Sequence, residues 1–349
     1  MSLRIAVLGA EHYHANFWIK AFLRSEGVAV AGVWDKDRAK AAALAGHHGV
    51  GVVENLDMLL GDSDAVAICS ATSEHVGFVR EASRRRLPIL CEKPLGATVS
   101  DGLEIERIVK ESGVPFMQSF PKRFDPINHE IRSLLADRAL GTVTLCRIRH
   151  GHGHGFEKDF RRSWFADPAL SGGGTLLDEG VHAADFLRWM FGEPGSVSAA
   201  ISSAALGLPV EDTAVATFHF QSGMFAEVTT SWCFTAADAS IEIYGTEGTL
   251  LLSGVDLASR ATHESAFLRV YSRKAGRWSA SSTIPHFKTG VFHEHVAWAF
   301  VRALKEGGPM PVTLEDGMRA LAMVEAAYRS AASGRLEAVR PHSEPGAGS

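Results

Sequence analysis

Short apolar runs alternate with helical segments between residues 4 and 120, and this pattern constrains the fold more than any other feature. The runs lie at residues 5–8, 28–34, 65–69, 88–91 and 114–120, with a weaker one at 52–53. Because they are continuously apolar instead of alternating with polar residues, they predict strands buried on both faces, as in a parallel sheet covered by helices. We therefore expect an α/β, doubly wound Rossmann domain of six strands over residues 1–121.

The pattern changes beyond Phe120, and residues 122–349 are expected to form a C-terminal α+β domain. Adjacent strand-like segments joined by tight turns predict a largely antiparallel open sheet. They lie at residues 142–150, 196–204, 213–220, 226–232, 241–244 and 250–253. Helices are expected at 126–136, 291–305 and 314–333. Residues 341–349 are rich in Pro, Gly and Ser and are expected to form a mobile tail.

Composition limits the class of partner. A net charge of −5 argues against nucleic acid or an anionic membrane surface, and the chain contains no apolar run of the length a membrane span needs. The four cysteines are far apart in the sequence, which indicates neither a zinc knuckle nor a disulfide framework. We therefore expect a soluble, cytoplasmic protein with a small-molecule partner.

The first apolar run ends at Gly9, where a dinucleotide-binding fold places a glycine-rich turn. The turn reads Gly9-Ala10-Glu11-His12-Tyr13-His14 and keeps only the first glycine of the G-x-G-x-x-G pattern. Asp35 closes the second run and is placed to hold the ribose hydroxyls of an adenosine, which favours NAD. Lys36 beside it leaves NADP open, because a cation can accept a 2′-phosphate.

Further polar residues follow the runs at 65–69 and 88–91, at the edge where such sheets bind ligands. Small residues there let a planar ring lie against the backbone, and Lys93 could hold or protonate a substrate oxygen. A surface ion pair is the ordinary alternative for a Glu-Lys dipeptide. The expected cofactor site comprises Gly9, Ala10, Glu11, His12, Asp35, Ser70, Ala71, Thr72, His75, Glu92 and Lys93.

Residues 172–182 read Gly-Gly-Gly-Thr-Leu-Leu-Asp-Glu-Gly-Val-His and place ionisable side chains on a mostly buried helix. The three glycines give a backbone that can approach a ligand closely, and Thr175 fits an N-cap with Asp178 completing a capping box. Asp178 and His182 fall on one stripe, a setting that suits acid/base chemistry. Taken alone, Asp178 fits a structural cap as well as a catalytic group, and a lone buried histidine such as His182 is more often a hydrogen-bonded core residue.

The segment His150-Gly-His152-Gly-His154 contains the imidazoles that zinc, copper and nickel prefer. Alternate residues on an extended segment would need a further ligand from elsewhere, so we expect no metal. With Trp164 in the following loop, these histidines suit binding of a polyhydroxylated substrate, and ordinary solvated surface is an equally good alternative.

Together these motifs resemble the glucose-fructose oxidoreductase and inositol dehydrogenase (Gfo/Idh/MocA) family of nicotinamide-dependent oxidoreductases, over nearly the whole chain. The resemblance rests on Glu92-Lys93-Pro94, Arg123-Phe124, residues 172–174 with Asp178-x-x-x-His182, and Tyr244-Gly245-Thr246-Glu247-Gly248-Thr249. It implies a catalytic set of Lys93, Asp178 and His182. We expect the substrate to contact Lys93, Arg123, His152, His154, Trp164, Asp178 and His182. The phosphate turn departs from the family, whose members usually keep more glycines there.

The resemblance implies an NAD-dependent dehydrogenase or reductase that moves a hydride between nicotinamide and a secondary alcohol or ketone of a sugar, cyclitol or related polyol. Within the catalytic set we assign His182 as the acid/base, Asp178 as the group that orients it and Lys93 as the cation that stabilises the reacting oxygen. The alternative exchanges the roles of Lys93 and His182. Two other functions known in the family stay open, a ligand sensor that keeps the dinucleotide and an NAD-dependent glycoside hydrolase.

The apolar residues of the second sheet also bear on assembly. We expect a homodimer or homotetramer, because Phe218, Phe220, Val228 and Trp232 would otherwise expose a patch on the open face of the sheet. Cover by the protein's own helices is the alternative.

Overall fold

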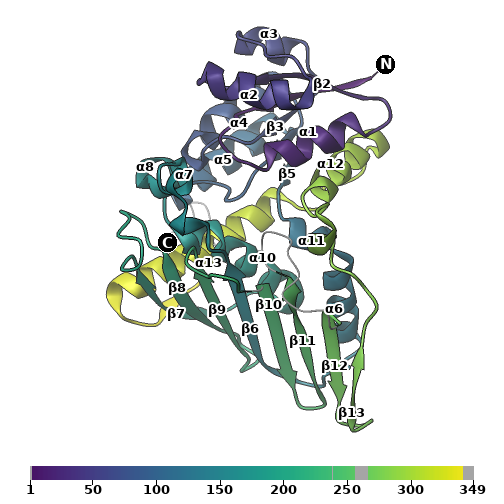
Figure 1. Ribbon diagram of the computed structural model, residues 1–349, viewed down its shortest axis with the longest axis vertical. Helices are drawn as coiled ribbons and strands as arrows, with labels where there is room; N and C mark the ends of the chain where they lie inside the picture. The colour runs from purple at the N-terminus through teal and green to yellow at the C-terminus, as the bar shows by residue number, and fades with distance from the viewer. Residues whose placement is uncertain (1, 238, 256–265, 341–349) are drawn as a thin grey trace, which may run out of the picture. The chain divides into compact units, whose positions relative to one another are not determined.

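The computed structural model describes residues 2–237, 239–255 and 266–340 (Figure 1). The chain divides into two units that are not continuous in sequence. The first comprises Met1–Phe124, Asp167–Gly172 and Gly290–Gly317, and the second comprises Asp125–Ala166, Gly173–Thr289 and Met318–Ser349. The expected tail at 341–349 lies outside the described residues. A single boundary near Pro121 stays our proposal for where the chain leaves the parallel sheet.

The first unit contains the expected doubly wound parallel sheet, with five strands among the described residues instead of six. They are β1 (Leu3–Leu8), β2 (Val28–Trp34), β3 (Ala65–Ile68), β4 (Ile89–Cys91) and β5 (Phe116–Gln118), in the order β2-β1-β3-β4-β5. The weak run at 52–53 forms only an isolated parallel bridge, Val33 to Val52. Two apolar residues flanked by Gly51 and Glu54 are too few to extend a ladder.

Helices flank this sheet. They are α1 (Ala15–Leu23), α2 (Arg38–His48), α3 (Leu56–Gly61), α4 (His75–Arg84), α5 (Val99–Ser112), α8 (Pro168–Ser171) and α12 (Glu294–Glu306), with 3-10 turns η1 (Thr72–Glu74) and η2 (Pro121–Phe124). Although α12 is distant in sequence, it packs on α1, where Lys20 and Arg24 form ion pairs of 2.7 and 3.2 Å with the buried Glu294. The helix expected at 291–305 is therefore α12, and it belongs to the first unit.

The second unit contains a nine-stranded sheet in its described part, in the order β13-β12-β11-β10-β6-β9-β8-β7-β14. The strands are β6 (Val143–Gly151), β7 (Ser196–Ser202), β8 (Thr213–His219), β9 (Phe225–Ser231), β10 (Ala239–Gly245), β11 (Gly248–Val255), β12 (Leu268–Ser272), β13 (Arg277–Ala280) and β14 (Glu337–Ala338). Neighbours pair antiparallel except β6 and β9, which are parallel. The sequence missed β12, β13 and β14, which are only five, four and two residues long.

The helices of this unit are α6 (Pro126–Ala136), α7 (Lys158–Arg161), α9 (Thr175–Asp178), α10 (Gly180–Phe191), α11 (His286–Thr289) and most of α13 (Leu314–Ser333). Two 3-10 turns, η3 (His154–Phe156) and η4 (Trp164–Ala166), follow β6. The predictions at 126–136 and 314–333 are confirmed by α6 and α13. None of the described helices combines the length and apolar character that crossing a membrane requires.

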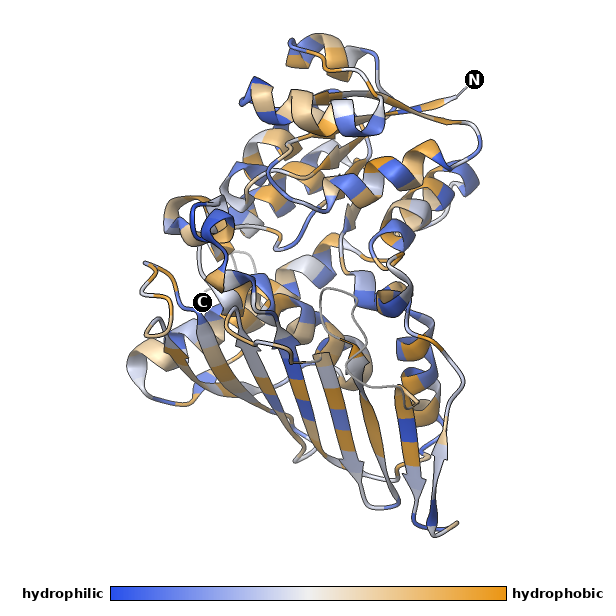
Figure 2. Ribbon diagram, viewed as in Figure 1, coloured by the Kyte–Doolittle hydropathy of each residue, from blue (hydrophilic) through white to orange (hydrophobic). Residues whose placement is uncertain are grey.

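Helices α6, α10 and α13 lie on one side of the nine-stranded sheet (Figure 1). Figure 2 shows its strands as alternating hydrophilic and hydrophobic bands, as expected of a sheet with one buried face. The expectation that Phe218, Phe220, Val228 and Trp232 form an exposed patch is wrong, because these side chains are 0–7% exposed within a single chain. The opposite face instead presents Val215 and Phe225, which are 41% and 45% exposed.

Candidate active site

The turn after β1 brings the predicted cofactor residues of the first unit together. Gly9 has φ +89°, and a Cβ there would lie 2.5 Å from the backbone of Ser70, so only glycine fits. The N–H of Ala10 donates to one oxygen of Asp35, and the N–H of Asp37 donates to the other, both at 2.7 Å. Asp35 is therefore fixed beside the turn, as a ribose-binding carboxylate requires.

The lysines around Asp35 are engaged by carboxylates. Lys36 forms an ion pair with Glu74, and Lys40 pairs with Glu11 of the turn at 2.6 Å. Hydrogen bonds to these glutamates raise the pKa values of both lysines. Lys36, the cation for which NADP was kept as an alternative cofactor, is thus already paired with an acidic side chain.

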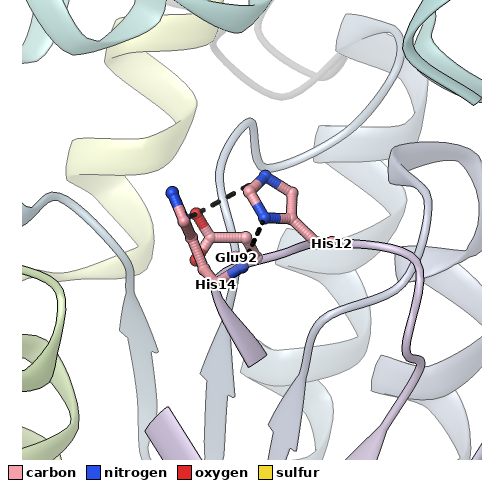
Figure 3. A group of neighbouring side chains, drawn as sticks. All are labelled: His12, His14 and Glu92. Atoms are coloured by element: carbon pink, nitrogen blue, oxygen red, sulfur yellow. Dashed lines mark hydrogen bonds and ion pairs between the residues drawn. The ribbon is translucent and has the colours of Figure 1, made fainter. Parts of the chain in front are cut away.

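Two imidazoles stand in the turn where the glycine pattern is lost (Figure 3). His14 Nδ1 lies 2.8 Å from Oε1 of Glu92, which is fully buried at the end of β4, and His12 Nε2 lies 4.0 Å from the same oxygen. The His293 ring lies against the His14 ring, with centroids 3.6 Å apart and the ring planes tilted by 32°. Burial raises the pKa of Glu92 and lowers that of His12 well below its usual range. Sequence reasoning missed the roles of His14 and His293, which only the fold brings to Glu92.

The other predicted residues of this unit are buried near the strand ends. Ser70, Ala71 and Thr72 are at most 1% exposed, and Lys93 is 2% exposed. His75 lies in hydrogen-bond reach of the Leu95 carbonyl at 3.2 Å, and burial lowers its pKa. The surface ion pair considered for the Glu92-Lys93 dipeptide is therefore wrong, because neither residue lies on the surface.

Arg123 lies in η2 and forms an ion pair of 2.7 Å with Asp316. Burial of Asp316 alone would raise its pKa, but the Arg123 guanidinium and hydrogen bonds from Thr313 lower it. Arg123 therefore has a structural partner within the first unit. Contact between Arg123 and substrate stays a prediction.

Gly173 and Gly174, the two glycines of the stretch that belong to the second unit, pack against protein atoms. A Cβ on Gly174 would lie 1.9 Å from the Glu211 carbonyl oxygen, and one on Gly173 would lie 2.3 Å from the Tyr328 hydroxyl. The N–H groups of Gly174 and Leu176 donate to the Glu211 carboxylate at 2.9 Å, and the Tyr328 hydroxyl donates at 2.7 Å. The capping prediction is wrong, because Gly174 is the N-cap residue and has no side chain. Glu211, remote in sequence, satisfies these donors.

The sequence predicted that Asp178 and His182 lie on one helix. That prediction is wrong, because they lie on two successive helices. Helix α9 ends at Asp178 and α10 begins at Gly180, with Glu179 at the junction (φ −98°, ψ −33°). Asp178 is 7% exposed and accepts a hydrogen bond of 3.1 Å from the Trp232 indole. His182 is 6% exposed, and its ring lies edge-on to His150 with centroids 5.4 Å apart. Asp178 and His182, two of the three predicted catalytic side chains, are therefore buried among polar side chains.

Glu179 is the residue of this cluster that sequence reasoning missed. Its Oε2 lies 3.1 Å from His150 Nε2, and its Oε1 lies 3.5 Å from His152 Nε2. One signal could have revealed it, since Glu179 follows Asp178 directly in an otherwise apolar stretch. The structure thus joins the histidine segment of β6 to the Asp178 and His182 region through one carboxylate.

The remaining predicted substrate residues lie after β6. His154 has a side chain that is 44% exposed and pairs with Glu157 at 2.8 Å, so it is not among the buried side chains around Glu179. Trp164 is 6% exposed and stacks on Phe165 at 4.0 Å. Of the three alternate histidines, His150 and His152 reach Glu179.

The family follows from two matches that together span most of the chain. Residues 3–120 match the oxidoreductase family with an NAD-binding Rossmann fold, and residues 128–251 match the GFO/IDH/MocA C-terminal domain. The chain belongs to this family. The expected resemblance, the fold class and the NAD-binding oxidoreductase assignment are thereby confirmed.

Relatives of known activity cover nearly the full length. The chain is 28% identical to a 1,5-anhydro-D-fructose reductase from Ensifer adhaerens, over 92% of this chain and 94% of the relative. It is also 28% identical to inositol 2-dehydrogenase 2 from Saccharopolyspora erythraea, over 99% and 98%. The chain is 25% identical in sequence to GenD2 from gentamicin A biosynthesis, whose crystal structure is in complex with NAD. The match covers 97% of this chain and 96% of GenD2, with a TM-score of 0.81.

Proposed function

We propose that this chain is an NAD-dependent dehydrogenase or reductase acting on a secondary alcohol or ketone of a sugar, cyclitol or related polyol. The observation that carries the proposal is the cluster in which the buried Asp178, Glu179 and His182 meet His150 of β6 and His152, which follows that strand. Buried acid/base groups of this kind are typical of reaction centres. The names of the two relatives, a sugar reductase and a cyclitol dehydrogenase, support the substrate class.

The dinucleotide would be held by the turn and strand ends of the first unit. Gly9 lets the turn pass close to Ser70, and Asp35 presents an anchored carboxylate for the ribose hydroxyls. Ala10, Glu11, His12, Ala71, Thr72, His75, Glu92 and Lys93 complete the proposed site. The bound cofactor supplies the hydride chemistry, and the protein supplies orientation and charge.

We assign one role to each member of the catalytic set. His182 takes the proton from the substrate hydroxyl, since an imidazole titrates near the working pH with little adjustment. Asp178, held by Trp232, orients His182 and the substrate. Lys93 stabilises the negative charge that develops on the reacting oxygen. Arg123, His152, His154 and Trp164 are proposed to contact the substrate.

An assay with NAD and a panel of polyols tests this function. We expect formation of NADH together with a ketone product for at least one sugar or cyclitol, read by absorbance and product analysis. Release of a free sugar without net NADH would identify an NAD-dependent glycoside hydrolase instead. Tight binding of NAD and a polyol without any turnover would identify a ligand sensor and contradict the proposal.

We also propose that the chain assembles as a homodimer or homotetramer through the open face of the nine-stranded sheet. The apolar side chains Val215 and Phe225 on that face support it, in place of the buried residues named from the sequence. Light scattering at micromolar concentration should give at least twice the chain mass. A monomer would contradict this assembly.

A further inference from the structure

Three buried donor groups of the second unit converge on one point. They are His150 on β6, Glu179 at the junction between α9 and α10, and His182 on α10, which are 3%, 8% and 6% exposed. One imidazole nitrogen from each histidine and one carboxylate oxygen lie within 4.8 Å of one another. The expectation of no metal rested on the lack of a further ligand for the histidines at 150, 152 and 154, and Glu179 supplies that ligand.

One distance in this group is close to the spacing that a small metal ion requires, and the other donors lie within 4.8 Å. Zinc binds imidazole nitrogen and carboxylate oxygen at roughly 2.0–2.2 Å in tetrahedral geometry, which puts neighbouring donors about 3.3–3.5 Å apart. His150 Nε2 and Glu179 Oε2 are 3.1 Å apart, so this pair needs a shift of only a few tenths of an ångström, while the His182 ring would close in from within 4.8 Å. A hydrogen bond accounts for the same distance, and the experiment below distinguishes the two.

The surroundings of Glu179 resemble those of metal-binding carboxylates. Its other oxygen, Oε1, lies 3.5 Å from His152 Nε2, and Glu179 forms a second group of neighbouring donors with His152 and Asp178. Partners of this kind orient a ligating carboxylate and hold its charge. A set of two imidazoles and one carboxylate selects zinc, cobalt or nickel over magnesium and calcium, which prefer oxygen ligands.

We propose that His150, Glu179 and His182 form a binding site for a divalent transition metal of the zinc type, and that the metal inhibits the enzyme. The inhibitory part rests on the proposed function, in which His182 is the base. An imidazole nitrogen that donates its lone pair to a metal cannot accept a proton from the substrate. The metal and the reaction therefore compete for His182.

Binding is tested on the full chain without NAD or substrate, after treatment with a chelator. Titration with Zn²⁺ in a calorimeter, and with Co²⁺ by visible absorption, should show one site with the spectrum of a four- or five-coordinate cobalt ion bound by nitrogen and oxygen. The cobalt spectrum requires no variant, so it stands even if a substitution unfolds the protein. Absence of both signals overturns the proposal.

Variants then locate the site. Loss of a residue that only orients a metal ligand weakens metal binding by ~10–100-fold, and His152→Ala should weaken Zn²⁺ binding within that range. Glu179→Gln and His150→Ala each remove a proposed ligand, so each should weaken Zn²⁺ binding by more. His219→Ala, which removes a histidine on β8 outside the group, is the matched control and should leave binding unchanged. His14→Ala tests the other histidine group in Figure 3. If it abolishes binding while Glu179→Gln does not, the site is wrongly placed.

Activity measurements complete the test once a polyol substrate is known. The chelator-treated enzyme should be fully active, and Zn²⁺ at the concentration that fills the site should inhibit it competitively with the polyol. Stimulation by Zn²⁺ would overturn the inhibitory role, while the binding data would still report on the site. Because binding is measured without turnover, failure to find any polyol substrate would count against the proposed function alone.

Discussion

The indole nitrogen of Trp232 donates a hydrogen bond of 3.1 Å to the carboxylate of Asp178, across 54 residues of sequence. Trp232 directly follows β9 and is fully buried, and Asp178 closes α9. The orientation of the proposed catalytic carboxylate is therefore set by the end of a sheet strand as well as by its own helix.

Replacing Trp232 with Phe tests this relationship, because it keeps an aromatic ring and removes the donor. We expect the free energy of unfolding to fall by about 1–3 kcal/mol, the cost of leaving a buried acceptor without its partner. Turnover should fall while the affinity for NAD stays the same. Chemical denaturation and steady-state kinetics measure both. An unchanged turnover with a confirmed substrate would show that the indole does not position Asp178 for catalysis.

Loss of the proposed base should affect the chemical step alone. We expect His182→Ala to lower turnover by roughly 100-fold or more, the usual scale for a general base. NAD affinity should stay nearly intact, because the proposed dinucleotide residues all belong to the first unit. Steady-state kinetics measure the loss of turnover, and titration with NAD on the same preparation measures the affinity.

Lys93→Ala provides the companion measurement. Since Lys93 is assigned to the charge on the reacting oxygen, its loss should also lower turnover by about 100-fold or more. If His182→Ala and Lys93→Ala both retain near-normal turnover, the catalytic set is wrongly assigned.

Cofactor preference should depend on Asp35. Its carboxylate repels a 2′-phosphate, so Asp35→Ala should tighten the binding of NADP and weaken the binding of NAD. We expect the preference to shift by about tenfold or more, which corresponds to roughly 1.4 kcal/mol. Binding titrations with both dinucleotides measure the shift.

Lys36→Ala is the control for that experiment, because Lys36 is already paired with Glu74. It should leave the preference nearly unchanged. Wild-type protein that binds NADP more tightly than NAD would contradict the role assigned to Asp35.

The fold was largely predictable because both sheets leave recognisable hydrophobic patterns in the sequence. Continuous apolar runs identified four of the five parallel strands closely, and the helices at 126–136 and 314–333 were predicted with their observed ends. The run at 52–53 failed because two residues cannot establish a strand. The patch containing Phe218 and Val228 was placed on the wrong face, since periodicity shows that a strand has an apolar side but not what covers it.

The site was predictable only where residues are close in sequence. The positions of Asp178 and His182 were indicated by their spacing, whereas Glu211, Trp232 and His293 reach the proposed sites through tertiary packing. Glu179 was hidden for a different reason. A continuous helix would turn it away from the stripe of Asp178 and His182, but the break between α9 and α10 lies at Glu179 itself.

Close packing at the start of α9 gives a stability prediction. A Cβ on Gly174 would meet the Glu211 carbonyl at 1.9 Å, so Gly174→Ala should destabilise the protein by about 1–3 kcal/mol or more. Gly77→Ala is the matched control. Gly77 lies in α4, and outside its chain neighbours and the helix's own backbone no atom lies within 4 Å of the added Cβ, so this change should be neutral or stabilise by up to about 1 kcal/mol. Thermal melting of both variants checks the contrast, and equal melting temperatures would refute it.

Glu211 should make the stability of the protein depend on pH. Burial raises the pKa of its carboxyl above the ordinary value of 4.5, although hydrogen bonds from Tyr328, Leu176 and Gly174 act in the opposite direction. The folded state therefore binds this proton more tightly than the unfolded state. The resulting stabilisation is fully present below the unfolded pKa and is lost as pH rises through the folded pKa.

The difference in unfolding free energy between wild type and Glu211→Gln isolates this contribution, because glutamine does not titrate. As pH falls from about 8 to about 5, the wild type should become more stable relative to the variant. Denaturant titrations at several pH values measure the difference, and Glu227→Gln, on the open face of the sheet, controls for a general effect of charge. A difference that stays constant or shrinks on acidification would show that the hydrogen bonds to Glu211 outweigh its burial, and that the carboxylate is charged throughout.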